Sequence, residues 1–258
     1  MPNPDTDRAD LDIVEMPAKA LAAYWLSLKK LMDSRKGGRV VQEEMAAVSE
    51  PYIRLLLETA FGSSLPEEAV RRLYTAGRRR QLFDLRRKLD CMARVLAAMV
   101  SGDNPQRVLS LLTALFAVPP VREAAVMERV YAQADKARAA TPPEEAPSGD
   151  PAAVDHGLPP EVLLSRLLHC LVVARREGRE ACRKLADSSR SLFFAEGLIL
   201  VADGFDEAFL RRRLTLHRRS ILADAAAKMV LAEEMCLGLR ARYSYEDLWR
   251  VARAHLPA

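Results

Sequence analysis

The chain has 258 residues, enough for one large domain or two small ones with a substantial core. Half of the residues are hydrophobic but only 6% are aromatic, and Ala, Leu, Arg and Glu dominate, which argues against a strand-rich fold and predicts an all-α protein. The net charge of +4 allows an anionic partner without requiring one.

The first half of the chain reads as successive helices. Apolar residues at three- and four-residue spacing predict a helix over 16–48, which the glycine pair Gly37–Gly38 interrupts. A second helix follows Ser49, its predicted cap, and ends at Gly62. A long arginine-rich helix, a capped helix over 103–117 and a charged outer helix over 119–140 complete this half.

The composition changes abruptly at "TPPEEAPSGDPAAVDHGLPP", which is rich in Pro, Ala and acidic residues and has no periodicity. We therefore expect a flexible linker there, followed by a second series of helices. The predicted organisation is a disordered tail over 1–18, a helical bundle over 19–117, a connecting helix over 118–140, a linker over 141–157 and a second bundle over 158–258.

The two halves repeat the same landmarks at an offset near 140 residues. "RKGGRVVQEEMA" (35–46) and "RREGREACRKLA" (175–186) each place an arginine three residues before a glycine. Gly62 and Gly204 each end an apolar segment, an acidic helix start follows each, and arginine runs come next. We interpret the halves as a duplicated helical unit and expect them to form tandem, similar bundles with Gly38 matching Gly178.

The core of these bundles is predicted from the apolar periodicity. In the first half it comprises Leu55, Leu56, Leu89, Met92, Leu96, Leu109 and Leu112, and in the second half Leu198, Val201, Met229, Leu248 and Val251.

The order of the segments resembles a known family. "ARREGREACRKLADSSRSLFFAEGLILVADGFDEAFLRRRL" is similar to the cytoplasmic loop of the flagellar stator protein MotA, and "KLDCMARVLAAMVSGDNPQRVLSLLTALF" is similar to its C-terminal tail. Together the two resemblances cover most of residues 20–117 and 160–257. In MotA two membrane helices separate loop and tail, whereas here the loop runs into the tail in both halves. The resemblance thus implies the cytoplasmic face without the ion channel.

In the MotA family, this cytoplasmic face contacts the rotor protein FliG through an arginine three residues before the glycine and a glutamate five after it. The matching positions are Arg35 and Glu43 in the first half and Arg175 and Arg183 in the second, where a base replaces the acid. The resemblance therefore implies a protein partner, either FliG or the stator subunits.

Helical spacing extends these positions into two charged stripes. Arg35, Arg39 and Glu43 are spaced at four residues and are expected to share one helix face. Arg175, Arg179 and Arg183 have the same spacing and are expected to form an all-positive stripe. Such stripes are either solvated surface or partner-binding surface, and charge complementarity would then mainly set partner choice and association rate.

A second charged feature is the pair of arginine runs Arg78, Arg79, Arg80 and Arg211, Arg212, Arg213. They could contact anionic headgroups in a weak peripheral membrane interaction, or they could simply be solvated. Nucleic-acid binding is a third interpretation, but aromatic interleaving is thin and no helix-turn-helix pattern is present. Nucleic acid is therefore the less favoured partner.

No membrane span, secretion signal, cofactor motif or catalytic constellation is predicted. The longest charge-free run covers 108–121 and contains prolines, whereas a span needs about 18–20 apolar residues. The four cysteines lack metal-ligand spacing, and His169–Cys170 lies in an apolar run that indicates a buried structural pair. We expect a soluble cytoplasmic protein, placed at the flagellar base by the MotA resemblance, that is not an enzyme. A helical adaptor or chaperone and a nucleic-acid-binding regulator stay open as alternatives.

Overall fold

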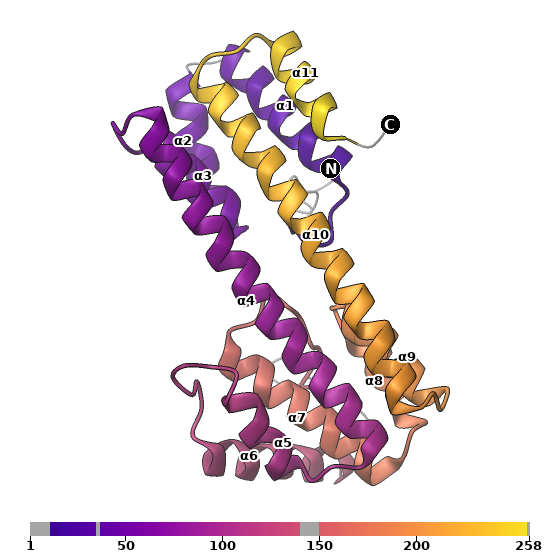
Figure 1. Cartoon of the computed structure of the whole chain (residues 1–258). Helices are drawn as coiled ribbons and strands as arrows, with labels where there is room; N and C mark the ends of the chain where they lie inside the picture. Colours follow the sequence, from indigo (N-terminus) through magenta and orange to yellow (C-terminus); the bar gives the residue numbers. More distant parts are fainter. Residues whose placement is uncertain (1–10, 35–36, 140–149, 257–258) are drawn as a thin grey trace, which may run out of the picture. The chain divides into compact units, whose positions relative to one another are not determined.

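The computed structural model describes residues 11–34, 37–139 and 150–256, which fold into helices joined by turns and loops and contain no strand (Figure 1). The all-α prediction is confirmed. The helices are α1 (Ala18–Ser34), α2 (Gly37–Ala47), α3 (Pro51–Phe61), α4 (Glu67–Ser101), α5 (Pro105–Thr113), α6 (Glu123–Ala139), α7 (Pro160–Glu177), α8 (Ala181–Ser188), α9 (Leu192–Ala202), α10 (Glu207–Arg240) and α11 (Tyr245–His255).

The chain forms two compact units, and each unit draws on both halves of the sequence. Unit 1 comprises Met1–Phe83 and Ile221–Ala258, and unit 2 comprises Asp84–Ser220. The long helices α4 and α10 each contribute one part to unit 1 and the other part to unit 2. The predicted bundles over 19–117 and 158–258 therefore do not coincide with the compact units.

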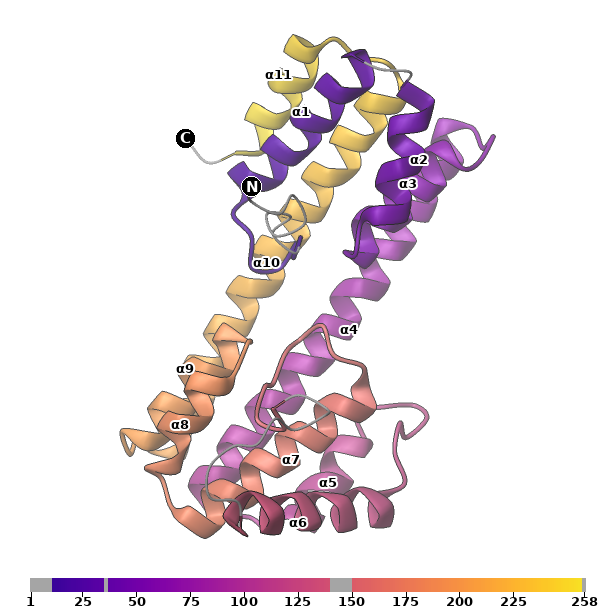
Figure 2. The ribbon, with the colours of Figure 1, turned by 180° about the vertical axis from the view of Figure 1, so that it is seen from behind.

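Unit 1 contains α1, α2, α3, the first part of α4, the last part of α10 and α11, and α1 and α11 lie side by side in both views (Figures 1 and 2). Its core includes three fully buried aromatic side chains, Trp25, Tyr52 and Tyr74. Among the residues predicted as core, Leu56, Met229 and Leu248 are buried here, while Leu55 and Val251 are only half-buried.

Unit 2 contains the last part of α4, helices α5 to α9, and the first part of α10. α6 packs on α5 and α7 and buries Val126, Met127 and Val130, so the predicted charged outer helix has one apolar face. The remaining predicted core residues are all buried in this unit: Leu89, Met92, Leu96, Leu109, Leu112, Leu198 and Val201.

Two short segments predicted to be flexible are packed. Ile13 is buried in the core of unit 1, although it belongs to the predicted disordered tail. Val154 belongs to the predicted linker, yet it is fully buried and its carbonyl accepts hydrogen bonds from the backbone N–H groups of Arg190 and Ser191. These two predictions are wrong for residues 11–17 and 150–157 because each segment supplies an apolar side chain and backbone acceptors; the rest of the predicted linker, 141–149, lies outside the described residues.

In each unit, a buried lysine binds backbone carbonyls of one of these two packed segments. Lys228 donates hydrogen bonds to the carbonyls of Val14 and Met16, at 2.8 and 2.9 Å, and Lys88 donates to the carbonyl of His156 at 2.9 Å. Each lysine also pairs with an aspartate four residues earlier, Asp224 or Asp84. We call each lysine, with its aspartate and the carbonyls it binds, a clamp. The residues of the two clamps correspond at the 140-residue offset. The helices α1–α5 and α7–α11 also correspond in order and in approximate length.

The predicted matching of glycines does not extend to their conformations. Gly178 has φ +85° and ends α7, whereas Gly38 lies inside α2 without a positive φ. Gly204 has φ +81°, whereas Gly62, which ends α3, has φ −89°. The clamp correspondence agrees with an internal duplication and the glycines do not, so the duplication stays a prediction.

Candidate functional site

The charged face of α2 is the first predicted site. α1 is described to Ser34 and α2 from Gly37, so the glycine pair forms the first residues of α2, and residues 35–36 lie outside the described part of the chain. Arg39 Nε lies 2.9 Å from Glu43 Oε1, and both side chains are largely exposed. An exposed pair at this spacing stabilises a helix by only about 0.2–0.5 kcal/mol, so these charges are available to a partner. Arg35 lies outside the described residues.

The second predicted stripe does not form one helix face. Gly178 ends α7 with a positive φ, which only glycine adopts without strain, and α8 begins at Ala181. Arg175 therefore lies in the last turn of α7, Arg179 in the connecting turn and Arg183 in α8. All three are exposed, but the prediction of a continuous stripe is wrong because the glycine turns the chain.

These three arginines contact different neighbours in unit 2. Arg183 Nη2 lies 2.7 Å from the carboxylate of Asp203, which offsets much of its charge. Arg175 donates to the backbone carbonyl of Asp103 at 3.3 Å, a neutral partner that leaves its charge uncompensated. Arg179 has no ion pair among the residues that the structure describes, so Arg175 and Arg179 carry most of the positive charge available at this end of α7.

Arg175 and Arg176 line a cavity of about 310 Å³ in unit 2, with Asn104, Pro105, Tyr131 and Val172 as the other lining residues. Arg176 pairs with Asp135 at 2.7 Å, and its guanidinium lies 5.7 Å from the centre of the Tyr131 ring. The α5 N-terminus, capped by the Asn104 side chain, adds the positive end of a helix dipole. The cavity is therefore chemically suited to an acidic side chain.

Fewer arginines of the two runs are available to contact an anionic surface than the sequence suggests. Arg78 is half-buried and pairs with Glu233 at 2.9 Å inside unit 1, so its predicted role as a surface contact is wrong. In unit 2, Arg211 pairs with Glu207 and Arg213 with Glu196. The other members, Arg79, Arg80 and Arg212, are exposed and have no ion pair among the residues that the structure describes.

A buried polar network in unit 1 was not predicted. The Tyr52 hydroxyl donates to Glu233, and the Tyr74 hydroxyl donates to the carbonyl of Leu56 at 2.8 Å and lies 3.4 Å from Cys236 Sγ. Burial raises the pKa of Glu233, and burial raises the pKa of the Cys236 thiol to about 12, so the thiol stays protonated. A single tyrosine or glutamate in a helical pattern gives no signal of such contacts, because its partners are distant in sequence.

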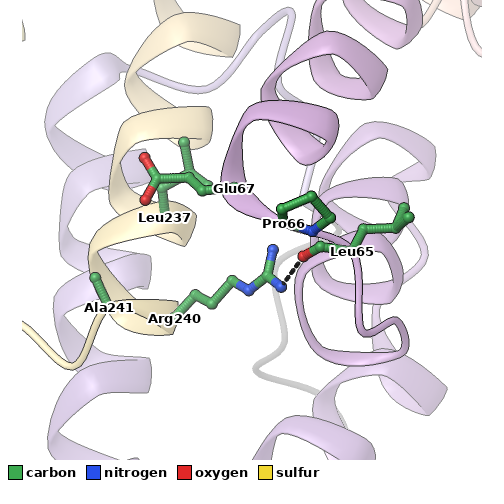
Figure 3. A pocket seen from close by; sticks show the side chains of 6 residues that line it. All are labelled: Leu65, Pro66, Glu67, Leu237, Arg240 and Ala241. Carbon is green, nitrogen blue, oxygen red and sulfur yellow. Dashed lines mark hydrogen bonds between the residues drawn. The ribbon is translucent and has the colours of Figure 1, made fainter.

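A smaller cavity of about 230 Å³ lies beside the start of α4 in unit 1 (Figure 3). Arg240 donates a hydrogen bond to the Leu65 carbonyl, while Pro66, Glu67, Leu237 and Ala241 complete the lining. Arg240 Nη1 is buried without a hydrogen-bond partner among the described residues. Because the Glu67 carboxylate lines the same cavity as the Arg240 guanidinium, the cavity carries charges of both signs and is not selective for an anion.

The other chemically notable side chains are structural. His169 and Cys170 are both buried, which confirms the predicted buried pair, and burial lowers the pKa of His169. The thiols Cys91, Cys170, Cys182 and Cys236 are all free and buried. Burial raises the pKa of Cys91 to about 12, so this thiol, like that of Cys236, is not reactive in the folded chain.

Across the described ranges, no helix combines the length and apolarity that crossing a membrane requires. Comparisons with protein-family models, with curated proteins and with solved structures find no match to this chain.

Proposed function

We propose that this chain is a stator-like interaction protein without a channel, which binds a protein of the flagellar motor through charged helix surfaces. The observation that supports this proposal is that every described residue of the predicted partner-binding set is exposed: Arg39, Glu43, Arg175, Arg179 and Arg183. The MotA resemblance of the surrounding segments supports FliG, or the stator subunits, as the partner.

The two charged surfaces differ in sign and therefore in the partner groups they suit. α2 presents Arg39 and Glu43 together, so it suits a partner helix that carries both charges. The end of α7 presents Arg175 and Arg179 beside the cavity lined by Arg176, so it suits an acidic side chain. The two surfaces are not interchangeable, and each can be tested separately.

The experiment is a binding titration of the purified full chain with purified FliG at low and high salt. Reversing the α2 pair in Arg39→Glu/Glu43→Arg keeps the net charge and the helix spacing, while Arg175→Glu/Arg179→Glu removes the positive surface. We expect salt-sensitive binding by the wild type and weaker binding, by about tenfold, in at least one double variant. Circular dichroism checks the fold of each variant. Absence of salt-sensitive binding by the wild type would refute FliG as the partner.

The arrangement of the arginines gives less support to nucleic-acid binding. Arg71, Arg78, Arg211, Arg213 and Arg218 all pair with carboxylates in the folded chain. Because affinity for a phosphate backbone depends on uncompensated positive charge, these pairs reduce the charge available for it. A titration with duplex DNA at the same two salt concentrations is the matched control.

A further inference from the structure

The exposed side of α10 in unit 2 carries an ordered row of side chains. Leu210 and Leu214 face the core and are almost fully buried. On the opposite side, Phe209, Arg212, Leu216 and Arg219 are exposed and are spaced by three, four and three residues. This spacing places them in one line along the helix, and we call these four residues the α10 stripe.

Apolar residues beside the helix extend this surface. The rings of Phe205 and Phe209 stack with their centres 4.7 Å apart. Glu196 of α9 lies 3.3 Å from Arg213 and 3.2 Å from His217, which joins α9 to α10 (Figures 1 and 2). Ile199, one helical turn beyond Glu196, is exposed on the same side of α9. The α10 stripe therefore lies within a wider apolar surface.

The corresponding part of α4 shows that the fold does not need these apolar side chains. At the 140-residue offset, Arg72 and Arg79 match the two arginines of the stripe, whereas Ala69 and Ala76 stand in place of Phe209 and Leu216. Phe209 is 44% exposed and Leu216 is 56% exposed, so neither contributes much to the core of unit 2. Large apolar groups exposed in a row, framed by charges, are typical of a surface that binds another protein.

The charges of the stripe indicate the sign of the charge that a partner should carry. Arg212 and Arg219 have no carboxylate within ion-pair distance among the residues described, and they lie seven positions apart, about 10.5 Å along a helix. Burial lowers the pKa of Arg218, and the nearby Arg86 and Arg219 lower it further. Because Arg218 itself pairs with Asp90, Arg219 supplies the uncompensated charge at this end of the stripe. A partner with acidic groups at heptad spacing would compensate both arginines.

We propose that the α10 stripe binds an acidic amphipathic helix of a protein partner, with apolar side chains packed on Phe209 and Leu216 and carboxylates facing Arg212 and Arg219. A protein helix fits better than a lipid surface because Glu196 and Asp206 lie beside the stripe: a layer of anionic headgroups would face these acids as well as the arginines, whereas a helix can place its carboxylates opposite Arg212 and Arg219 alone. This site is separate from the charged surfaces of α2 and α7, and it stands whether or not the chain binds FliG.

The probe is a fluorescein-labelled peptide of about three heptads, with leucine at the two core positions and glutamate at the flanking positions. A second peptide carries lysine in place of glutamate. Fluorescence anisotropy measures the binding of each to the full chain. Two variants test the stripe, Phe209→Ala/Leu216→Ala and Arg212→Glu/Arg219→Glu. The matched control is Arg72→Glu/Arg79→Glu, which makes the same charge change on α4, and circular dichroism monitors folding.

We expect the acidic peptide to bind, the lysine peptide to bind at least about tenfold more weakly, and each stripe variant to lose about tenfold in affinity while the α4 control loses little. Equal binding of both peptides, or equal losses in the α4 control, would overturn the proposal. So would binding to vesicles of phosphatidylcholine and phosphatidylserine without binding to the acidic peptide. A wild-type dimer that Phe209→Ala/Leu216→Ala abolishes would make a second copy the occupant and would also overturn it.

Discussion

Units 1 and 2 contain the same kind of lysine clamp, but the clamping lysine comes from the second half of the chain in unit 1 and from the first half in unit 2. In unit 2 a lysine of the first half, Lys88, holds the carbonyl of His156, which precedes the first helix of the second half. In unit 1 a lysine of the second half, Lys228, holds the carbonyl of Met16, which precedes the first helix of the first half. Each unit therefore contains parts of both halves of the chain, and the two halves do not fold as separate domains.

The clamps of the two units are alike, but their cores differ in the buried polar groups they contain. Unit 1 buries Tyr52 and Tyr74, whose hydroxyl groups bind Glu233 and a backbone carbonyl. At offsets of 142 and 140 residues, unit 2 buries Phe194 and Leu214, which have no polar atom. Because buried polar groups demand partners and apolar ones do not, substitutions at buried charges should cost more in unit 1 than at the corresponding positions in unit 2.

The largest expected effect comes from separating the halves. A specific protease site inserted between residues 144 and 145 would cut the chain within the predicted linker, outside the residues that the structure describes. We expect the two fragments to stay associated after cleavage, with an unchanged elution volume and helical circular dichroism, because each unit contains parts of both. Each fragment expressed alone should lose most of its helical signal. Two fragments that fold and elute separately would instead support tandem bundles.

Local pattern was sufficient to predict the helices and much of the core. Leu89, Met92 and Leu96 follow the three- and four-residue spacing and are buried as predicted. Helix starts were less well predicted: α3 is capped by Glu50, whose carboxylate accepts from the N–H of Ile53 at 2.6 Å, and not by Ser49. A glutamate is an uncommon cap, and propensity favours the adjacent serine.

Long-range organisation could not be predicted because it depends on contacts between distant residues. The pattern of α4 is continuous across Phe83 and Asp84, so nothing in it marks the change from one unit to the other. Arg78 belongs to a run that looks like surface, and only the position of Glu233, 155 residues later, turns it inward. The α2 charges were found because Arg39 and Glu43 interact within one helix turn.

The second prediction compares two ion pairs whose arginines, Arg78 and Arg218, correspond at the 140-residue offset. Arg78→Met in unit 1 leaves Glu233 buried without its cation, and we expect a loss of about 3 kcal/mol in the free energy of unfolding. Arg218→Met in unit 2 leaves the more exposed Asp90, and we expect about 1 kcal/mol. Urea denaturation measures both. Adding Glu233→Gln to Arg78→Met should restore most of the loss, and equal losses in the two single variants would contradict the comparison.

The third prediction concerns the clamps themselves. Lys228→Met removes the donor to two backbone carbonyls, and we expect it to destabilise the protein by about 2 kcal/mol, whereas Lys88→Met removes the donor to one and should cost about 1 kcal/mol. Thermal and urea unfolding measure the difference. The exposed Lys184→Met is the control and should change stability by less than about 0.5 kcal/mol. A larger cost at Lys88 than at Lys228 would show that the number of bound carbonyls does not determine clamp strength.

The last prediction is a pH dependence that originates at Glu50 in unit 1. The N-cap of α3 is Glu50, whose pKa is raised from 4.5 to about 7, mainly by burial, whereas the N-cap of the corresponding helix α9 is Ser191, which does not titrate. Since the folded state binds this proton more tightly than the unfolded state, the contribution is fully present below about pH 4.5 and is lost as the pH rises through about 7. Glu50→Gln mimics the protonated carboxyl. We therefore expect the wild type to lose about 1–2 kcal/mol relative to this variant between about pH 5 and about pH 8, measured by urea unfolding at each pH. Ser191→Ala should leave the pH slope of the wild type unchanged, and parallel wild-type and Glu50→Gln curves would show that Glu50 ionises normally in the folded chain.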